Sequence, residues 1–205
     1  MNYLSHSLLS GTNELILTGN FVGDFVKGRN LTMYPYDVQT GVLLHRYIDS
    51  YTDTSPIVKD CKKFFITSYG KYSGIIVDII FDYFLSLHWQ QFTHIPKNIY
   101  ISHVYTVLQK YIAILPQRAQ RIVPPIIYYN WLQNYGSING IQKVLNRMIL
   151  RKGIPSATTE CIDILRKNHS VLEKYFLLFF YELQNKIQTE DFFVAHLSIL
   201  PQRIM

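Results

Sequence analysis

Residues 41–53 read GVLLHRYIDSYTD, an apolar segment in which His45, Asp49 and Asp53 recur at intervals of four. Side chains four positions apart lie one above the other on the same face of an α-helix. A helix here therefore sets an imidazole beside a carboxylate, with Arg46 about 100° around the axis. Such polar groups are costly to bury without a partner. The segment predicts a helix whose polar face meets either a salt bridge or a metal ion.

The same helical spacing continues along nearly the whole chain, and no segment alternates polar and apolar residues as a strand does. We find no internal repeat, low-complexity tract or linker that would divide the sequence. The sequence predicts an all-α fold, one compact helical domain over residues 1–205. The expected helices cover 12–28, 34–51, 55–65, 74–92, 98–115, 126–135, 137–153 and, as one helix or a broken pair, 156–188.

Two glycines interrupt the first of these helices. Gly19 and Gly23 flank Asn20 and Asp24, which lie four positions apart. A glycine inside a helix costs up to about 1 kcal/mol relative to alanine. We therefore expect another backbone or a ligand to approach closely at these two positions.

The composition is that of a densely packed globular protein, with 48% hydrophobic, 15% aromatic and only 17% charged residues in 205. Asp78, Asp82 and His88 interrupt even the most apolar stretch, SGIIVDIIFDYFLSLHW, so no segment reaches the roughly 20 apolar residues of a membrane span. The N-terminus lacks the basic start and cleavage site of a signal peptide. Two cysteines, Cys61 and Cys161, make a disulfide scaffold unexpected. We expect a soluble cytoplasmic protein.

The chain is moderately basic, with 20 Lys and Arg against 14 Asp and Glu and a net charge of +6. A basic surface attracts polyanions, whether nucleic acid, anionic lipid or an acidic protein. The sequence contains no helix-turn-helix or zinc-finger pattern. The charge alone does not choose among these partners.

Polar residues recur in pairs within otherwise apolar helices. The pairs, with one further histidine near the N-terminus, are Asn20 and Asp24, His45 and Asp49, Asp78 and Asp82, and His6. Several carboxylates converging in a core repel one another, and a divalent cation removes that conflict. A mixed His and Asp set without thiolates suits Mn²⁺, Fe²⁺ or Mg²⁺. Facing helices of a bundle are a familiar way to assemble such a site.

Structural roles stay open for most of these residues. His45 suits a buried imidazole hydrogen-bonded to a carbonyl, and Asp49 suits an ion pair with Arg46. Asp82 either faces outward or braces a ligand, and His88 fits an ordinary helix end. Asp78 is harder to explain in this way, since neither neighbouring turn supplies a basic partner. The spacing alone makes a metal site one of two interpretations.

The polar residues fall within motifs that resemble the acyl carrier protein phosphodiesterase family. The strongest runs are NYLSHSLLS, LTGNFVGDFVKG, GVLLHRYIDSYTD and IIVDIIFDYFLSLHW. The similarity continues more weakly through ILPQRAQR, NWLQNY and IQKVLNRMILRKGIP, and so covers about the first three-quarters of the chain. The family is in turn similar to HD phosphohydrolases, all-helical enzymes with a divalent metal. The sequence departs from the standard HD signature, because Arg46 rather than an aspartate follows His45.

The resemblance implies hydrolysis of the phosphodiester that joins 4′-phosphopantetheine to a serine of holo acyl carrier protein. Mn²⁺ is the expected metal, with Mg²⁺ or Fe²⁺ as alternatives, and it would polarise a phosphoryl oxygen and generate hydroxide near neutral pH. Arg46 or Lys27 would balance charge on the phosphoryl oxygens, and His88 would protonate the leaving serine oxygen. The implied metal site draws on His6, Asp24, His45, Asp49, Asp78 and Asp82. Among these, Asp49 and Asp82 serve as ligands or as braces of ligands.

Acyl carrier proteins are small and acidic, so the resemblance also gives the basic surface a use, with no nucleic acid or membrane partner. Two candidate docking patches are Lys59 with Lys62 and Lys63, and Arg147 with Arg151 and Lys152. Two other functions remain open: a metal-dependent phosphohydrolase of small phosphodiesters, and a helical binding protein with a structural polar core. The aromatic run EKYFLLFFYEL is expected in the core rather than at a dimer face, and the oligomeric state stays open.

Overall fold

The computed structural model describes residues 2–152 and 157–197, apart from the side chains of 149–152 and 194. Every regular element in this part of the chain is a helix, as the sequence predicted. The elements are α1 (Tyr3–Leu8), α2 (Glu14–Val22), η1 (Gly23–Phe25), α3 (Tyr36–Thr54), α4 (Pro56–Lys63), α5 (Ile66–Tyr69), η2 (Gly70–Tyr72), α6 (Ser73–Leu87), α7 (Trp89–Phe92), α8 (Lys97–Lys110), η3 (Ile112–Ile114), α9 (Gln117–Tyr128), α10 (Trp131–Asn134), α11 (Ile138–Lys152), α12 (Thr158–Lys167), α13 (His169–Thr189) and α14 (Asp191–Val194).

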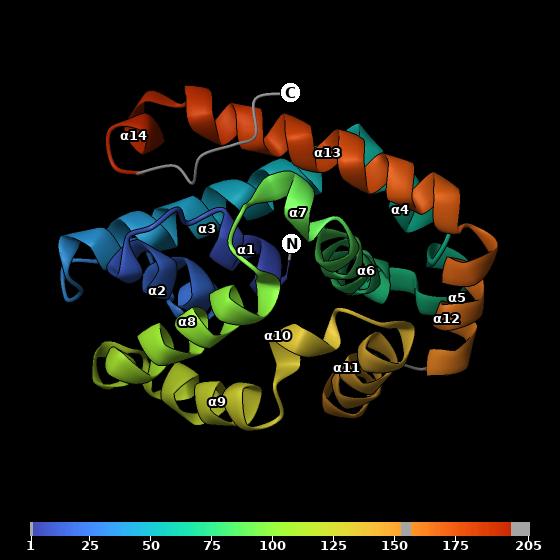
Figure 1. The fold of residues 1–205 in the computed structure, drawn as a ribbon, viewed down its shortest axis with the longest axis horizontal. Coiled ribbons are helices and arrows are strands. Elements are labelled where there is room, and N and C mark those ends of the chain that lie inside the picture. The colour runs from blue at the N-terminus through green and yellow to red at the C-terminus, as the bar shows by residue number, and fades with distance from the viewer. Residues whose placement is uncertain (1, 153–156, 198–205) are drawn as a thin grey trace.

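Helix α6 lies in the middle of the molecule, with α1, α2 and α3 grouped to one side and α13 along one edge (Figure 1). It packs against α1, α4, α11 and α13. The aromatic run of α13 faces this core, since Phe176, Phe179 and Phe180 are fully buried. The prediction that the aromatic run belongs to the core is confirmed for these three rings, whereas Tyr181 of the same run is 39% exposed.

Helices α2 and α3 pack closely against each other, and glycines allow it. A Cβ on Gly19 would lie 2.1 Å from the carbonyl oxygen of Val38, and one on Gly41 would lie 2.1 Å from that of Ile16. Neither position can carry a side chain without moving a backbone. The expected close approach at Gly19 is confirmed, and Gly41 is its counterpart on the facing helix.

Helix α1 is only six residues long, too short to be stable alone. Its first turn is held by α6: the backbone amides of Leu4 and Ser5 donate to the Asp82 carboxylate at 2.9 and 3.0 Å. The hydroxyl of Ser5 donates to the same group at 2.5 Å. Asp82 therefore acts as a helix cap supplied from another element, and it fixes α1 on the core.

Several predicted helix boundaries are wrong. Helix α2 ends at Val22 rather than Gly28, and the chain passes through η1 into a loop in which Gly28 has a φ of +80°. The expected helix over 126–135 is divided, because Asn130 adopts a left-handed conformation between α9 and α10. The segment 156–188 is the broken pair α12 and α13, and α13 runs on to Thr189.

In the part of the chain that is described, no single helix has the length and apolar character to cross a membrane; one pair, Pro56–Lys63 with Ile66–Leu87, has both in combination but is bent by 73°.

Candidate metal centre

One cluster of metal-ligating groups forms within the described residues, from α1 and α3. His6 Nε2 lies 3.2 Å from Asp49 Oδ1, and His45 Nε2 lies 3.1 Å from Asp49 Oδ2. The two imidazole rings stack with centroids 4.1 Å apart and planes 20° from parallel. Three of the predicted ligands therefore meet, with one donor atom from each within 4.8 Å of the others.

Asn20, on α2, orients both imidazoles. Its side-chain oxygen lies 2.8 Å from His6 Nδ1, and its backbone carbonyl oxygen lies 2.7 Å from His45 Nδ1. The Asn20 amide nitrogen donates to the His6 carbonyl and to Ser10 Oγ, which assigns the side-chain oxygen to the His6 ring. Each ring then donates from Nδ1, so each Nε2 carries a lone pair into the cluster. Metal-binding histidines are commonly held in this way.

The buried Nε2 of His45 is the least satisfied atom of the cluster. Although it lies 3.1 Å from Asp49, it has no hydrogen-bond partner of suitable geometry among the described residues. A ring lone pair facing a carboxylate is unfavourable unless a proton or a cation lies between them. The donor set of two imidazoles and a carboxylate therefore fits a divalent cation.

The pKa shifts of the cluster residues also favour a positive charge in the site. Burial lowers the pKa of His6, and the neighbouring His45 lowers it further. Burial also opposes the charging of His45, but Asp24 and Asp49 together raise its pKa to about 9. Burial opposes the ionisation of Asp49, yet its two imidazole neighbours hold its pKa well below the usual range. Asp24 and Asp49 thus both favour positive charge at the His45 ring, which a bound cation would also supply.

Asp24 marks the open side of the cluster. It lies on η1, its side chain is 72% exposed, and its Oδ1 is 3.6 Å from His45 Nε2. Gly23 presses on the other face of the imidazole, since a Cβ there would lie 2.3 Å from His45 Cγ. The neighbour at Gly23 is thus the His45 side chain, and neither the backbone nor the bound ligand that the sequence led us to expect. The Asp49 side chain is itself 38% exposed, so the two carboxylates form the exposed part of the site and the imidazoles its buried part.

The two candidate ligands on α6 do not join the cluster of three. The carboxylate of Asp82 is taken up by the first turn of α1, so in this structure it supports the helix of His6 instead of presenting a free oxygen. Asp78 lies one turn earlier, is half-buried, and is absent from the group of mutually close donor atoms. The sequence could not separate these roles, because spacing on one helix does not reveal what the next helix brings to it.

The residues of this cluster lie within a region that matches a known protein family. The family model described as acyl carrier protein phosphodiesterase matches residues 1–183, which include every residue discussed above. The chain belongs to the acyl carrier protein phosphodiesterase family.

Three relatives carry that same name. The protein from Yersinia pestis is 29% identical over 189 residues, 92% of this chain and 98% of its own. The protein from Photorhabdus laumondii subsp. laumondii is 30% identical over 196 residues, 94% of this chain and 98% of its own. The protein from an Enterobacter species is 31% identical over 181 residues, 88% of this chain and 94% of its own. No solved structure matches the chain at a significant level, so the similarity to HD phosphohydrolases stays a prediction.

In this member of the acyl carrier protein phosphodiesterase family, Arg46 holds a loop. Its Nη2 donates to the carbonyl oxygens of Val26 and Gly28, at 3.2 and 2.7 Å. Lys27, between them, is exposed. Arg46 does not pair with Asp49 as one interpretation of the sequence proposed, because its guanidinium turns toward the loop after η1. The charge-balancing role predicted for Arg46 and Lys27 stays a prediction.

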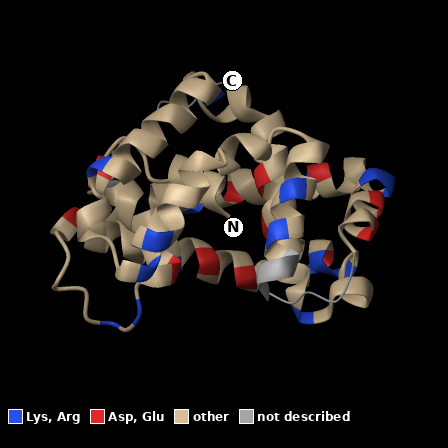
Figure 2. Ribbon diagram, turned by 90° about the horizontal axis from the view of Figure 1, so that it is seen from below, with Lys and Arg blue, Asp and Glu red and all other residues tan. Residues whose placement is uncertain are grey.

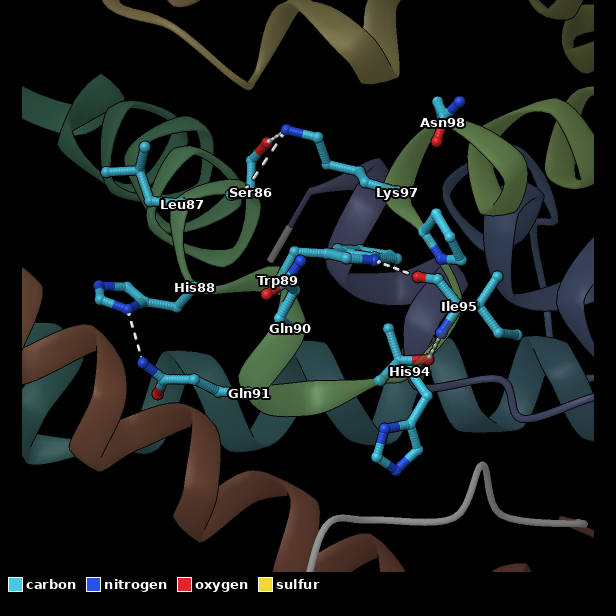
Figure 3. Close-up of a pocket in the computed structure, with 12 residues that line it drawn as sticks. Ser86, Leu87, His88, Trp89, Gln90, Gln91, His94, Ile95, Lys97 and Asn98 are labelled. Atoms are coloured by element: carbon cyan, nitrogen blue, oxygen red, sulfur yellow. Dashed lines mark hydrogen bonds between the residues drawn. The ribbon is translucent and has the colours of Figure 1, made fainter.

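His88 lies apart from the cluster's hydrogen bonds. Its Nε2 is 2.7 Å from Glu173 of α13, and its Nδ1 is 2.9 Å from the side-chain nitrogen of Gln91. It borders a pocket of about 730 Å³ between α6 and α8, where Lys97 reaches Ser86 (Figure 3). With both ring nitrogens occupied, His88 has no free N–H for a leaving group in this conformation. Its role as the proton donor is an untested prediction.

The residue that the sequence undervalued is Asn20. The sequence showed it only as one member of a polar pair, and in the structure it bonds to the backbone of α1. Its larger contribution is to fix two imidazoles at once. The available signal was its position four residues before Asp24, on a helix with glycines on both sides of it.

Proposed function

We propose that the chain hydrolyses the phosphodiester of holo acyl carrier protein, releasing 4′-phosphopantetheine and apo acyl carrier protein. Membership of the family and coverage of nearly the full length of its relatives support this reaction. The observation that carries it is the cluster of His6, His45 and Asp49, in which both Nε2 atoms converge beside an exposed carboxylate. A charged, solvent-accessible cluster of this kind suits a phosphorylated substrate better than it suits a structural core.

The proposed cofactor is Mn²⁺, with Mg²⁺ or Fe²⁺ as alternatives, held by His6, His45 and Asp49 with Asp24 at the open side. Such a cation supplies positive charge that polarises a phosphoryl oxygen and makes water more acidic. Asn20 keeps both rings in the tautomer that leaves Nε2 unprotonated. Gly23 leaves room for the His45 ring, and Asp24 faces the side from which a phosphodiester arrives.

A cytoplasmic location is part of the same proposal. Both cysteines, Cys61 and Cys161, are buried free thiols, which suits a reducing compartment. The acidic carrier protein is the proposed macromolecular partner, and neither nucleic acid nor a membrane is needed for the reaction.

The test is intact-mass analysis of holo acyl carrier protein incubated with the chain and Mn²⁺, with and without a chelator. We expect the carrier protein to lose the mass of phosphopantetheine only when the metal is free to bind. His45→Ala should abolish this loss, because it removes the buried nitrogen with no partner. His103→Ala is the matched control, since His103 is exposed on α8, and it should react like the unaltered chain.

An unchanged carrier mass with Mn²⁺ demonstrably bound would overturn the proposed substrate and favour a small phosphodiester instead. An unchanged mass with no metal bound would overturn the enzymatic function altogether. Circular dichroism of each variant excludes loss of folding as the cause.

A further inference from the structure

Several surface cations on α4, α8 and α12 lie beside acidic side chains. Lys62 pairs with Asp53 at 3.1 Å, and Lys63 pairs with Asp60 at 2.6 Å. Lys110 pairs with Glu14, and Arg166 lies near Asp163. Two of the three lysines in the predicted patch at Lys59 are therefore paired, which weakens it as a docking site for an acidic protein. In the other predicted patch, the Arg151 and Lys152 side chains lie outside the described residues.

A second group of cations has no acidic partner among the described residues, and two of its members follow Asp24 on the same loop. Lys27 and Arg29 are exposed on the loop between η1 and α3, directly after Asp24. Arg118 of α9 approaches the same point, with its guanidinium carbon 5.9 Å from the ring centre of Phe25. Figure 2 shows this loop at the lower left, with Lys and Arg positions along it in blue. We call Lys27, Arg29 and Arg118 the cationic edge.

The loop that carries the cationic edge is held in place. Val26 and Leu31 anchor it in the core, each less than a tenth exposed. Arg46 clamps the carbonyls on both sides of Lys27, and Asn30 accepts from the Thr32 amide to form a turn. Charges that are already ordered lose less conformational entropy on binding. The loop therefore holds its cations at the surface in one conformation.

The same loop also exposes apolar side chains. Met33 is 80% exposed and Tyr36, at the start of α3, is 60% exposed. Methionine and aromatic residues are enriched at protein interfaces, where charged groups form the rim. Cations and apolar side chains together on one ordered loop suit a folded protein partner better than a small anion.

We propose that the cationic edge is the docking surface for an acidic face of the carrier protein substrate, and that docking there brings the modified serine to the Asp24 side of the cluster. The inference rests on the proposed function for the identity of the partner. It rests on the structure for the place: Lys27 and Arg29 follow Asp24 on one ordered loop, and Arg118 approaches Phe25, the residue next to Asp24. Charges at an interface rim act mainly through association rate and orientation.

Binding of fluorescently labelled holo carrier protein to the metal-free full-length chain, followed by anisotropy, tests the docking surface without turnover. We expect Arg29→Glu with Arg118→Glu to weaken binding at least about tenfold, the scale of electrostatic steering. The neutral pair Arg29→Gln with Arg118→Gln should fall between that variant and the unaltered chain. Raising salt from 50 to 300 mM should reduce the differences, because charges become screened.

The matched control is Lys167→Glu with Lys186→Glu, which makes the same change in net charge on α12 and α13. It should bind within about twofold of the unaltered chain, because rim charges act locally. Equal weakening by both pairs, no weakening by the first pair, or no binding by the unaltered chain would each overturn the docking surface. If the unaltered chain removes phosphopantetheine from the carrier protein but Arg29→Glu with Arg118→Glu binds the carrier protein normally, the proposed reaction stands and only the docking surface is rejected. If binding depends on the cationic edge but the carrier protein loses no mass, the docking surface stands and the proposed reaction is rejected.

Discussion

Asn20 bonds to both imidazoles of the cluster, but by different parts of the residue. The side chain holds His6, and the backbone carbonyl holds His45. A substitution at this position therefore releases one ring and keeps the other. This asymmetry lets the contribution of a single hydrogen bond to metal binding be measured.

We predict that Asn20→Ala lowers the affinity for Mn²⁺ by about 10- to 100-fold, the usual effect of losing a residue that orients a ligand. The free energy of unfolding should fall by about 1–3 kcal/mol, because the His6 carbonyl and ring lose buried partners. Titration calorimetry and denaturant unfolding measure the two effects.

Asn13→Ala is the matched control, since Asn13 caps α2 through the amides of Leu15 and Ile16. It should lose about 1 kcal/mol of stability and keep its metal affinity. An Asn20→Ala variant that binds Mn²⁺ as tightly as the unaltered chain would contradict the orienting role.

The unpartnered nitrogen of His45 gives a second prediction at this scale. Mn²⁺ at 100 times its dissociation constant should stabilise the fold by about 2.7 kcal/mol, since it binds the native state alone. A chelator should reverse the rise in melting temperature, and His45→Ala should show no rise. Scanning calorimetry with and without metal decides the question. A full rise in His45→Ala would place the metal elsewhere.

At the scale of elements, the crossing of α2 and α3 determines the geometry of the cluster. Asn20 lies on one helix, and His45 and Asp49 lie on the other. Gly19 and Gly41 bring these backbones together where no Cβ fits. The distance between α2 and α3 therefore sets how far Asn20 lies from His45.

We predict that Gly41→Ala destabilises the fold by about 1–3 kcal/mol or more, because its Cβ meets backbone atoms of Ile16 and Asn20 that cannot turn aside. Gly74→Ala is the control, since its Cβ meets only the flexible end of Lys62, at 3.4 Å. That variant should be neutral or slightly more stable, because alanine favours helix. Urea unfolding measures both. Equal stability of the two variants would contradict the close approach.

The sequence predicted the helices and the two residues His45 and Asp49 because both signals are local, resting on the 3.6-residue period. It did not predict that Asp82 caps α1 or that His88 pairs with Glu173. Those partners lie 77 or more residues away along the chain, and no local pattern encodes which long-range partner a polar side chain will meet. For the same reason it assigned Asp24 to α2, whereas the packing of Gly23 on the His45 ring accompanies an earlier helix end.

At the scale of the whole molecule, α13 closes the core with one face and meets solvent with the other. Phe176, Phe179 and Phe180 are buried, whereas Leu178 is 51% exposed. The family match stops within this helix, at residue 183, but the rings before that point pack on α6, as Phe81 does against Phe176. The later residues also contact α3, which carries His45 and Asp49, through Tyr47 and Phe193.

We predict that Phe176→Ala lowers the free energy of unfolding by about 3–5 kcal/mol, through lost burial and the cavity left behind. Leu178→Ala, the matched substitution on the exposed face, should change it by less than about 0.5 kcal/mol. Urea unfolding and sedimentation velocity check both variants. A change of oligomeric state in Leu178→Ala would show that α13 serves as an interface between copies of the chain.

The cap that Asp82 provides for α1 also imposes an order of events on synthesis. His6 is synthesised before Asp82, because the carboxylate that holds its helix follows 78 residues after Leu4. A six-residue helix does not persist through that interval on its own. The newly made chain therefore cannot offer His6 and His45 together until α6 has emerged and docked. A fragment released before that point should lack the proposed metal site, so binding of Mn²⁺ would report that α1 and α6 have docked.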